Sequence, residues 1–412
     1  MSVNSGETIE LALTPRSCPG CDESRLTALW SQTFLAETRG PARRFDTRVA
    51  QCPRCGFVLA SPAPAQADLD AYYADHGADW QGQSLDYSVP AREGFLRRHL
   101  TPGSRVVEIG GAAEGPFWDA LRREYPACVV VQPNTVQRSN AHTLAELAQG
   151  SADAVVHYYV LEHIRDVSAF LAGSAALLVA GGLMLCEVPD LGLYPTDASG
   201  LALYEHQNHF TVDTLARVAA RAGLTLVDVS HEFASRPFGF VSAFRRESGD
   251  EQIAPASPGS IAHARACVDG GLALIRAYEA QMTAINARLK VAAQRGAGGV
   301  VWAANDVLRA LIDIAGPLPA GTTIVDSDPA KQFVRGQPVV RPEQARQALG
   351  EAGLLVICSE LHRDAILASA IEIGDDPSLA ERTAVISSYD NPGRLWWDAR
   401  GSGSSSAIAR PS

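Results

Sequence analysis

The sequence contains almost no lysine and no excess of positive charge. Only Lys290 and Lys331 occur among 35 basic residues, and 46 acidic residues give the 412-residue chain a net charge of −11. A protein that neutralises the phosphates of nucleic acid needs a basic face. The composition therefore argues against nucleic acid as a partner.

Long apolar segments are also missing. The most apolar stretch, residues 171–186, is interrupted by Gly181 and Gly182, and it is shorter than the roughly 20 residues that a membrane span needs. The first ten residues lack the basic region and apolar run of an export signal. These absences predict a cytoplasmic protein that does not use the membrane as a partner.

Four cysteines near the N-terminus form two Cys-Pro-x-Cys pairs. Cys18 and Cys21 make the first pair, and Cys52 and Cys55 make the second. Two such turns can present four thiolates to one tetrahedral zinc ion, and four protein ligands leave no open position for catalysis. We therefore expect a structural zinc site. Two unrelated pairs, or two redox dithiols, are the alternatives, but the segment after Cys55 has the pattern of an extended chain rather than of the helix that follows a redox pair.

From about residue 72 to residue 246, short apolar runs alternate with amphipathic stretches, which is typical of an α/β sheet. The runs at 104–111, 127–134, 152–164, 181–189 and 224–230 predict strands, whereas 115–125 and 210–223 predict helices. Ligands of such sheets bind outside the carboxyl ends of the strands. The candidate residues are therefore those that end the predicted strands: Glu108–Gly115, Gln132, Tyr159–His163 and Glu187–Pro189.

The turn "VVEIGGAAEGPF" has the form of a cofactor-binding turn after a first strand. Backbone N–H groups in such a turn can approach a charged ligand closely. A side chain at Gly110 would then fill the space that the ligand needs. The spacing of the glycines in this turn does not by itself identify a cofactor site.

Three segments, "VVEIGG", "YYVLEHIRDVSAFL" and "YEHQNHFTVDTLARVAARAGL", occur in the order and spacing of class I S-adenosylmethionine-dependent methyltransferases. With the N-terminal cysteine pairs and a C-terminal domain, residues 15–398 resemble the three-part sugar-nucleotide C-methyltransferases of deoxysugar pathways. That family implies a Rossmann-like α/β core and methylation of a carbon beside a ketone, through proton abstraction and enolate attack.

The resemblance also assigns residues to roles. His206 would be the base, with Glu205 beside it, His163 would be a second active-site histidine, and Tyr87 would approach the substrate. The residues expected at the cofactor, S-adenosylmethionine, are Glu108, Gly110, Gly111, Gly115, Gln132 and Tyr159. The small-molecule substrate would be a sugar nucleotide or a similar natural-product intermediate.

Three features depart from the family pattern. The turn lacks its central glycine, and Gln132 stands where the family has an acid that holds ribose hydroxyls. The segment between Gln132 and Asp153 is too short for both a helix and a further strand. These departures leave open a non-methylating enzyme or a ligand-binding protein on the same fold. A scaffold protein is a third hypothesis, but a scaffold has no need of histidines at strand ends.

The predicted organisation has an N-terminal zinc-binding domain at 1–70, a methyltransferase-like domain at 71–248 and a C-terminal α/β domain at 261–398. The tail at 399–412 has nothing to bury and is expected to be disordered. The C-terminal domain begins with a long amphipathic helix interrupted at Gly270–Gly271, followed by strands of a second small parallel sheet. There, Asn305, Asp326 and Lys331 are candidates for substrate contact.

Overall fold

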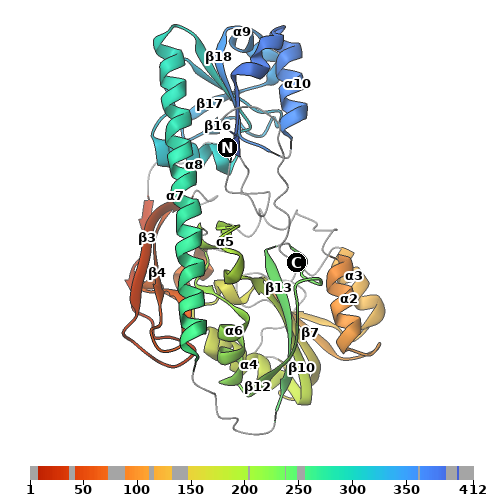
Figure 1. Ribbon diagram of the computed structural model, residues 1–412. Coiled ribbons are helices and arrows are strands. Elements are labelled where there is room, and N and C mark those ends of the chain that lie inside the picture. The colour runs from red at the N-terminus through yellow and green to blue at the C-terminus, as the bar shows by residue number, and fades with distance from the viewer. Residues whose placement is uncertain are drawn as a thin grey trace. The chain divides into compact units, whose positions relative to one another are not determined.

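A computed structural model describes most of the chain as two compact units. The described residues are 8–36, 42–72, 89–110, 116–131, 147–202, 205–236, 238–247, 256–360, 362–386 and 397–398. The first unit comprises Met1–Pro195 and Gly200–Gly270, and the second comprises Thr196–Ser199 and Gly271–Ser412. The cysteine-rich segment and the central sheet thus belong to one unit (Figure 1).

The central sheet of the first unit has six strands in the order β12-β13-β10-β9-β7-β8. β7, β8, β9 and β10 run parallel, whereas β13 is antiparallel to both of its neighbours. The strands are β7 Val106–Ile109, β8 Val129–Val131, β9 Ala152–Tyr158, β10 Leu178–Pro189, β12 Leu224–Ser230 and β13 Gly239–Arg246. This sheet confirms the expected Rossmann-like α/β fold.

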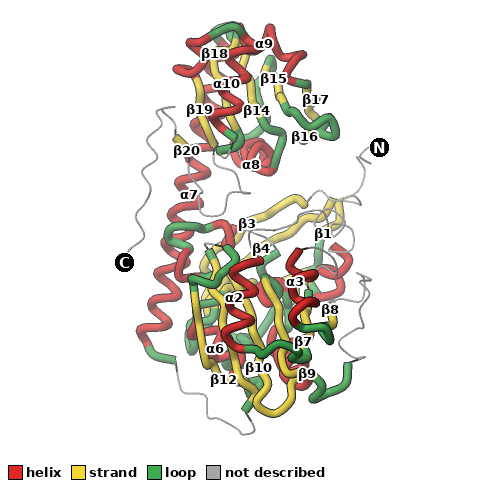
Figure 2. Tube along the Cα trace, turned by 90° about the vertical axis from the view of Figure 1, so that its right-hand side faces the viewer, coloured by secondary structure: helices red, strands yellow, loops and turns green. Residues whose placement is uncertain are grey.

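Helices cover both faces of this sheet. They are α2 Val89–His99, α3 Pro116–Glu124, α4 Val167–Leu177 and α6 Val212–Ala220, with the short elements η3 Leu161–His163, η4 Leu191–Leu193 and α5 Ser199–Ala202. Successive strand residues point to opposite faces, so Val106 packs with α2 and α3 while Val107 packs in the core that holds α4 and α6. Figures 1 and 2 show α2 and α3 on one face and α4 and α6 on the other.

Among the described residues, β8 is the edge strand on its side of the sheet. Gln132 and residues 133–146, the short segment that departs from the family pattern, lie outside the described residues. The chain re-enters at residue 147 and reaches β9 five residues later. The prediction that this crossover is trimmed therefore stays a prediction.

The N-terminal segment folds into two small sheets. One follows the order β1-β4-β5-β11, with β3 also paired to β4, and the other pairs β2 with β6. The strands are β1 Thr8–Glu10, β2 Leu13–Thr14, β3 Thr27–Ala36, β4 Ala42–Gln51, β5 Val58–Ala60, β6 Ala63–Pro64 and β11 Asn208–His209. β11 comes from the middle of the chain, so the N-terminal sheet includes part of the segment "YEHQNHF".

The longest helix, α7 (Pro258–Gln294), is continuous, and the predicted interruption at Gly270–Gly271 is wrong. Gly270 lies against Pro195, and a Cβ at this position would come within 2.9 Å of the proline ring. The glycine therefore provides space for a neighbour instead of breaking the helix. None of the helices in the described ranges is long and apolar enough to cross a membrane.

The second unit contains a seven-stranded sheet in the order β16-β17-β15-β14-β18-β19-β20. Its strands are β14 Gly298–Trp302, β15 Thr322–Val325, β16 Phe333–Val334, β17 Gln337–Val340, β18 Ala352–Ile357, β19 Thr383–Ile386 and β20 Trp397–Asp398. Its further helical elements are α8 Asp306–Ala315, η5 Pro342–Ala345, α9 Arg346–Gly350, α10 Arg363–Gly374 and η6 Pro377–Arg382. The central strands run parallel, as the sequence predicts.

Two polar residues of this unit have internal roles. Asn305 caps α8, because its side chain accepts from the N–H groups of Val307 and Leu308. Asp326 accepts from Ala304 N and lies 3.2 Å from Lys331 Nζ. These bonds explain the residues as local structure, while their proposed contact with substrate stays a prediction.

A histidine buried in the central sheet should make the protein sensitive to acid. His157 in β9 is fully buried, neither ring nitrogen has a hydrogen-bond partner among the described residues, and burial lowers its pKa to about 3. The unfolded chain takes up a proton near pH 6.5, so stability is lost as pH falls from about 6.5 towards 3, by up to about 1.4 kcal/mol per pH unit. His157→Leu should remove this loss.

Urea unfolding at pH 7, 6 and 5 measures the effect as the difference between variant and wild type. His362→Leu is the matched control, because that side chain is exposed. If the free energy of unfolding falls by the same amount between pH 7 and pH 5 in wild type and in His157→Leu, the prediction is wrong.

Candidate functional site

The carboxyl ends of the parallel strands bring acidic residues to one edge of the central sheet. Glu108 lies near the end of β7 and Glu187 near the end of β10. Glu187 is fully buried and accepts from Ser235 Oγ, at 2.9 and 2.8 Å to its two oxygens, from the Ser235 N–H and from the Tyr159 hydroxyl at 3.2 Å. Its carboxylate is therefore held in place by donors from two loops.

Glu108 differs from Glu187 because one oxygen of its buried carboxyl group lacks a donor among the described residues. It is 3% exposed, and its Oε2 has no hydrogen-bond partner in the described part of the chain. Burial raises the pKa of Glu108 to about 7, and the positive charge of Arg92 opposes that rise. A carboxyl group in this state is ready to accept a positively charged ligand.

Arg92 of α2 is a site residue that the sequence analysis missed. Its guanidinium lies over the rings of Tyr158 and Phe117, 4.3 and 5.3 Å from their centroids. Its Nε is 3.5 Å from Glu187 Oε2 but makes no hydrogen bond among the described residues. Nothing local in the sequence marks this arginine, because its position depends on how α2 packs on the sheet.

The turn after β7 requires a glycine at position 110. Its φ is +86°, and a Cβ there would lie 2.6 Å from Val160 Cγ2. A substitution at Gly110 would therefore disturb the turn itself, and the expected contact of Gly110 with the cofactor stays a prediction. Gly111 and Gly115 lie outside the described residues, as does Gln132.

Tyr159 follows β9 with a positive φ of 55°. The Arg236 guanidinium lies over its ring at 5.1 Å, and the Phe238 ring packs against it edge to face with centroids 5.8 Å apart. The backbone N–H donates to Glu187 O at 2.8 Å. Tyr159 is thus locked at the edge where the sequence analysis places it.

The two predicted histidines come together from separate segments. The rings of His163 and His206 pack edge to face with centroids 5.1 Å apart. Burial lowers the pKa of His163 to about 4 and that of His206 well below its usual value, where His163 and His209 add to the effect. Both rings are therefore neutral at pH 7.

The tautomer of His206 follows from one hydrogen bond. Its Nδ1 lies 2.8 Å from the carbonyl oxygen of Gly200. A carbonyl oxygen only accepts, so Nδ1 carries the hydrogen and Nε2 keeps its lone pair. The free lone pair is what a proton acceptor requires.

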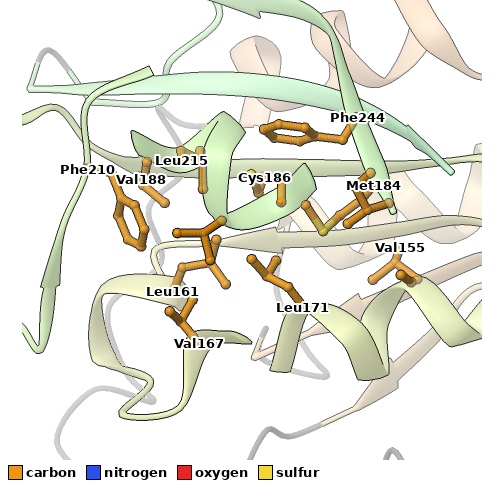
Figure 3. Packing of buried hydrophobic residues seen from close by; sticks show 14 of the residues in the cluster. Val155, Leu161, Val167, Leu171, Met184, Cys186, Val188, Phe210, Leu215 and Phe244 are labelled. Carbon is orange, nitrogen blue, oxygen red and sulfur yellow. The ribbon is translucent and has the colours of Figure 1, made fainter. Parts of the chain in front are cut away.

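Buried side chains hold the segment of His163 in place. Leu161, two residues earlier in η3, packs beside Val167 and Leu171, and the ring of Phe210 approaches from the other side (Figure 3). Because Phe210 directly follows β11, one core anchors both histidine segments. The Gln207 N–H also donates to Glu162 O at 2.6 Å, which joins the two backbones.

Glu205 has a partner that the sequence analysis did not foresee. The hydroxyl of Tyr72 donates to Glu205 Oε1 at 2.5 Å, and both side chains are buried. Tyr87, the tyrosine expected near the substrate, lies outside the described residues.

The N-terminal segment positions the histidine segment directly. β5 pairs with β11, and Ala60 N donates to Gln207 O at 3.0 Å. Arg16 donates to the carbonyls of Ala60 and Gln207 at 3.1 and 2.7 Å and to Asn208 Oδ1 at 2.8 Å. Burial lowers the pKa of Arg16 to about 9. The guanidinium therefore acts as a buried connector between the two segments.

The four N-terminal cysteines meet as the sequence predicts. All four Sγ atoms lie within 4.8 Å of one another, with Cys18 and Cys55 at 3.3 Å and Cys21 and Cys52 at 3.4 Å. Hydrogen bonds from Cys18 and Cys55 lower the pKa of the Cys52 thiol. A tetrahedral zinc ion with Zn–S bonds of about 2.3 Å needs sulfurs about 3.8 Å apart. The two shortest sulfur distances are below this value, so the cluster could hold a zinc ion once the sulfurs move slightly apart, and all four thiols are free of disulfides.

Comparison with known proteins identifies relatives. The chain is 28% identical to the C-methyltransferase NovU of Streptomyces niveus over 203 residues, which are 45% of this chain and 48% of NovU. The chain thus spans about half the length of this curated relative in the match.

Two solved structures also align with the chain. An S-adenosylmethionine-dependent methyltransferase from Mesorhizobium loti aligns at 19% identity and a TM-score of 0.30, covering 38% of this chain and 98% of that one. The 1,6-didemethyltoxoflavin-N1-methyltransferase of Burkholderia thailandensis, with 1,6-didemethyltoxoflavin and S-adenosylhomocysteine bound, aligns at 16% identity and a TM-score of 0.34, covering 48% and 99%.

Residues 89–229 match the sequence model of a family described as a methyltransferase domain. The match begins at α2 and ends within β12, so it includes the Glu108 turn and both histidines. This part of the chain is therefore similar to a methyltransferase domain, and the sheet that it builds has the Rossmann-like α/β fold.

Proposed function

We propose that the chain is an S-adenosylmethionine-dependent C-methyltransferase that acts on a carbon beside a ketone in a nucleotide-linked deoxysugar or a similar natural-product intermediate. The similarity to a C-methyltransferase supports carbon as the acceptor. The observation that carries the proposal is the buried His206, whose Nε2 lone pair is fixed by the bond from Nδ1 to Gly200 O.

Carbon is a poor nucleophile until a base removes a proton from it. In the proposed reaction His206 Nε2 takes the proton beside the ketone, and the electron pair of the C–H bond moves towards the carbonyl oxygen to give an enolate. His163 packs against His206 and restricts its ring, while Tyr72 fixes the carboxylate of Glu205, the next residue along the chain. The bound cofactor would supply an electrophilic methyl group that the enolate carbon attacks.

The residues at the strand ends fit the amino-acid end of S-adenosylmethionine. That end carries one ammonium and one carboxylate. Glu108 has a buried oxygen without a donor, and Arg92 has a buried Nε without an acceptor among the described residues. We assign the ammonium to Glu108 and the carboxylate to Arg92 because opposite charges then meet in a buried setting.

The four-cysteine cluster is proposed to hold a structural zinc ion. Its four sulfurs would complete the coordination shell, so zinc would stabilise the N-terminal fold and take no part in methyl transfer.

Calorimetry with S-adenosylmethionine and S-adenosylhomocysteine tests the proposed function. We expect one binding site per chain for each ligand. If neither ligand binds at millimolar concentration, the methyltransferase proposal is wrong, and a non-methylating protein on this fold becomes the better hypothesis. Transfer of a labelled methyl group to a keto sugar nucleotide, with the product analysed by NMR, tests the acceptor class.

Arg92→Leu should weaken binding of S-adenosylhomocysteine about tenfold to a hundredfold, because a hydrogen bond to a charged group contributes about 1.5–3 kcal/mol. Affinity for 5′-methylthioadenosine, which lacks the amino-acid end, should stay near that of wild type. Arg98→Leu on the same helix is the control, since its side chain is 53% exposed. Equal losses for both ligands would show that Arg92 supports the fold rather than the amino-acid end.

A further inference from the structure

A buried carboxylate faces the two active-site histidines. Glu162 is 1% exposed, and neither of its side-chain oxygens has a hydrogen-bond partner in the described part of the chain. Its Oε1 lies 3.8 Å from His163 Nε2. A buried carboxyl group without a donor in such a place can bind a cation that reaches it.

Glu162, His163 and His206 together make a set of metal-binding donors. One donor atom from each residue lies within 4.8 Å of the others. Two segments supply them, η3 and the loop before β11, and these are the segments joined by the bond from Gln207 N to Glu162 O.

The surroundings of His206 match those of a metal ligand. A ligating histidine usually donates its second ring nitrogen to a carbonyl or carboxylate, which fixes the ring and directs the other nitrogen at the ion. His206 donates Nδ1–H to Gly200 O, and His163 has a hydrogen bond to the backbone of Glu205.

We propose that Glu162, His163 and His206 form a second divalent-cation site, suited to zinc, and that an ion bound there inhibits methyl transfer. The inhibition rests on the proposed function, whereas the binding does not. Two imidazoles and one carboxylate are a donor set that zinc accepts in sites with a fourth, open position.

The three donor side chains must move closer together to bind one ion. Bonds of about 2.1 Å to a tetrahedral ion hold donors about 3.4 Å apart, so the three side chains must move together by about an ångström. His163 is 24% exposed and provides the route for the ion. The ion would take the lone pair of His206 Nε2, and this histidine could then no longer accept the proton from the substrate.

The test is a titration of the full-length protein, already carrying one zinc per chain at the cysteines, with Zn²⁺ and with Co²⁺. We expect a second equivalent to bind, with a Co²⁺ spectrum that lacks thiolate charge-transfer bands. Glu162→Gln should lose the second equivalent and keep the first, and His163→Asn should do the same. Glu187→Gln is the matched control, because Glu187 is equally buried but already has its donors.

Retention of the first equivalent also reports that each variant is folded. In an assay of methyl transfer, the second equivalent should slow wild type at least tenfold. A wild-type protein that takes up only one equivalent at millimolar Zn²⁺, or a Glu162→Gln variant that keeps two, would overturn the site. If two equivalents bind to a protein that transfers no methyl group, the site stands and the proposed function fails.

Discussion

His206→Ala is expected to fold, to retain zinc and to bind S-adenosylhomocysteine with wild-type affinity, while its turnover falls about 100- to 10,000-fold. That is the usual contribution of a positioned general base. The expectation rests on the tautomer, because the bond from Nδ1 to Gly200 O leaves Nε2 as the proton acceptor. Turnover under saturating cofactor, with exchange of the acidic substrate proton into deuterated water, measures the step directly.

Two comparisons make the His206 result specific. His231→Ala removes an exposed imidazole from the same unit and should leave turnover close to wild type. If His206→Ala stays within tenfold of wild type, the base lies elsewhere and His163 is the next candidate. Loss of proton exchange together with turnover would place His206 at proton abstraction, whereas loss of turnover alone would place it at a later step.

Cys52→Ser should produce the largest loss of stability. Cys52 is fully buried in the four-sulfur cluster, and structural zinc contributes about 10–16 kcal/mol of apparent binding free energy in small zinc domains. We expect zinc content well below half an equivalent and an N-terminal segment that unfolds or is cleaved by protease at temperatures where wild type is intact.

Cys128→Ser is the control for this experiment, because Cys128 belongs to a different core cluster on the central sheet. Its zinc content should equal that of wild type. Full zinc occupancy and an unchanged thermal transition in Cys52→Ser would rule out the four-cysteine site. Removal of zinc from wild type by a chelator should reproduce the variant and should also lower turnover, because β5 supports β11.

The sequence predicts the parts of this fold that depend on local periodicity. Apolar runs such as 104–111 and 181–189 become β7 and β10, and residues that end these strands gather at one edge. The rings of His163 and His206, which the resemblance assigns to one site, lie side by side, although His206 precedes a strand of the N-terminal sheet.

Contacts between distant segments explain what the sequence analysis missed. Arg92 and Tyr72 reach the site from α2 and from a segment before it, and no motif marks either residue. Gly270 has the pattern of a helix break, yet it permits close approach of Pro195. The close approach of Val160 to Gly110 is likewise a contact between separate segments that the turn sequence does not show.

The buried connector Arg16 has a consequence for how this enzyme can be recombined with its relatives. Its guanidinium satisfies carbonyls in β5 and in the histidine segment, and it lies two residues before Cys18. A chimera that takes an N-terminal segment without this arginine but keeps the native residues 205–210 would remove one donor from the Gln207 carbonyl and one from the Asn208 side chain. The segment of the cysteine pairs and the segment of the histidines therefore have to be exchanged together, although almost 150 residues separate Cys55 from Glu205 in the chain.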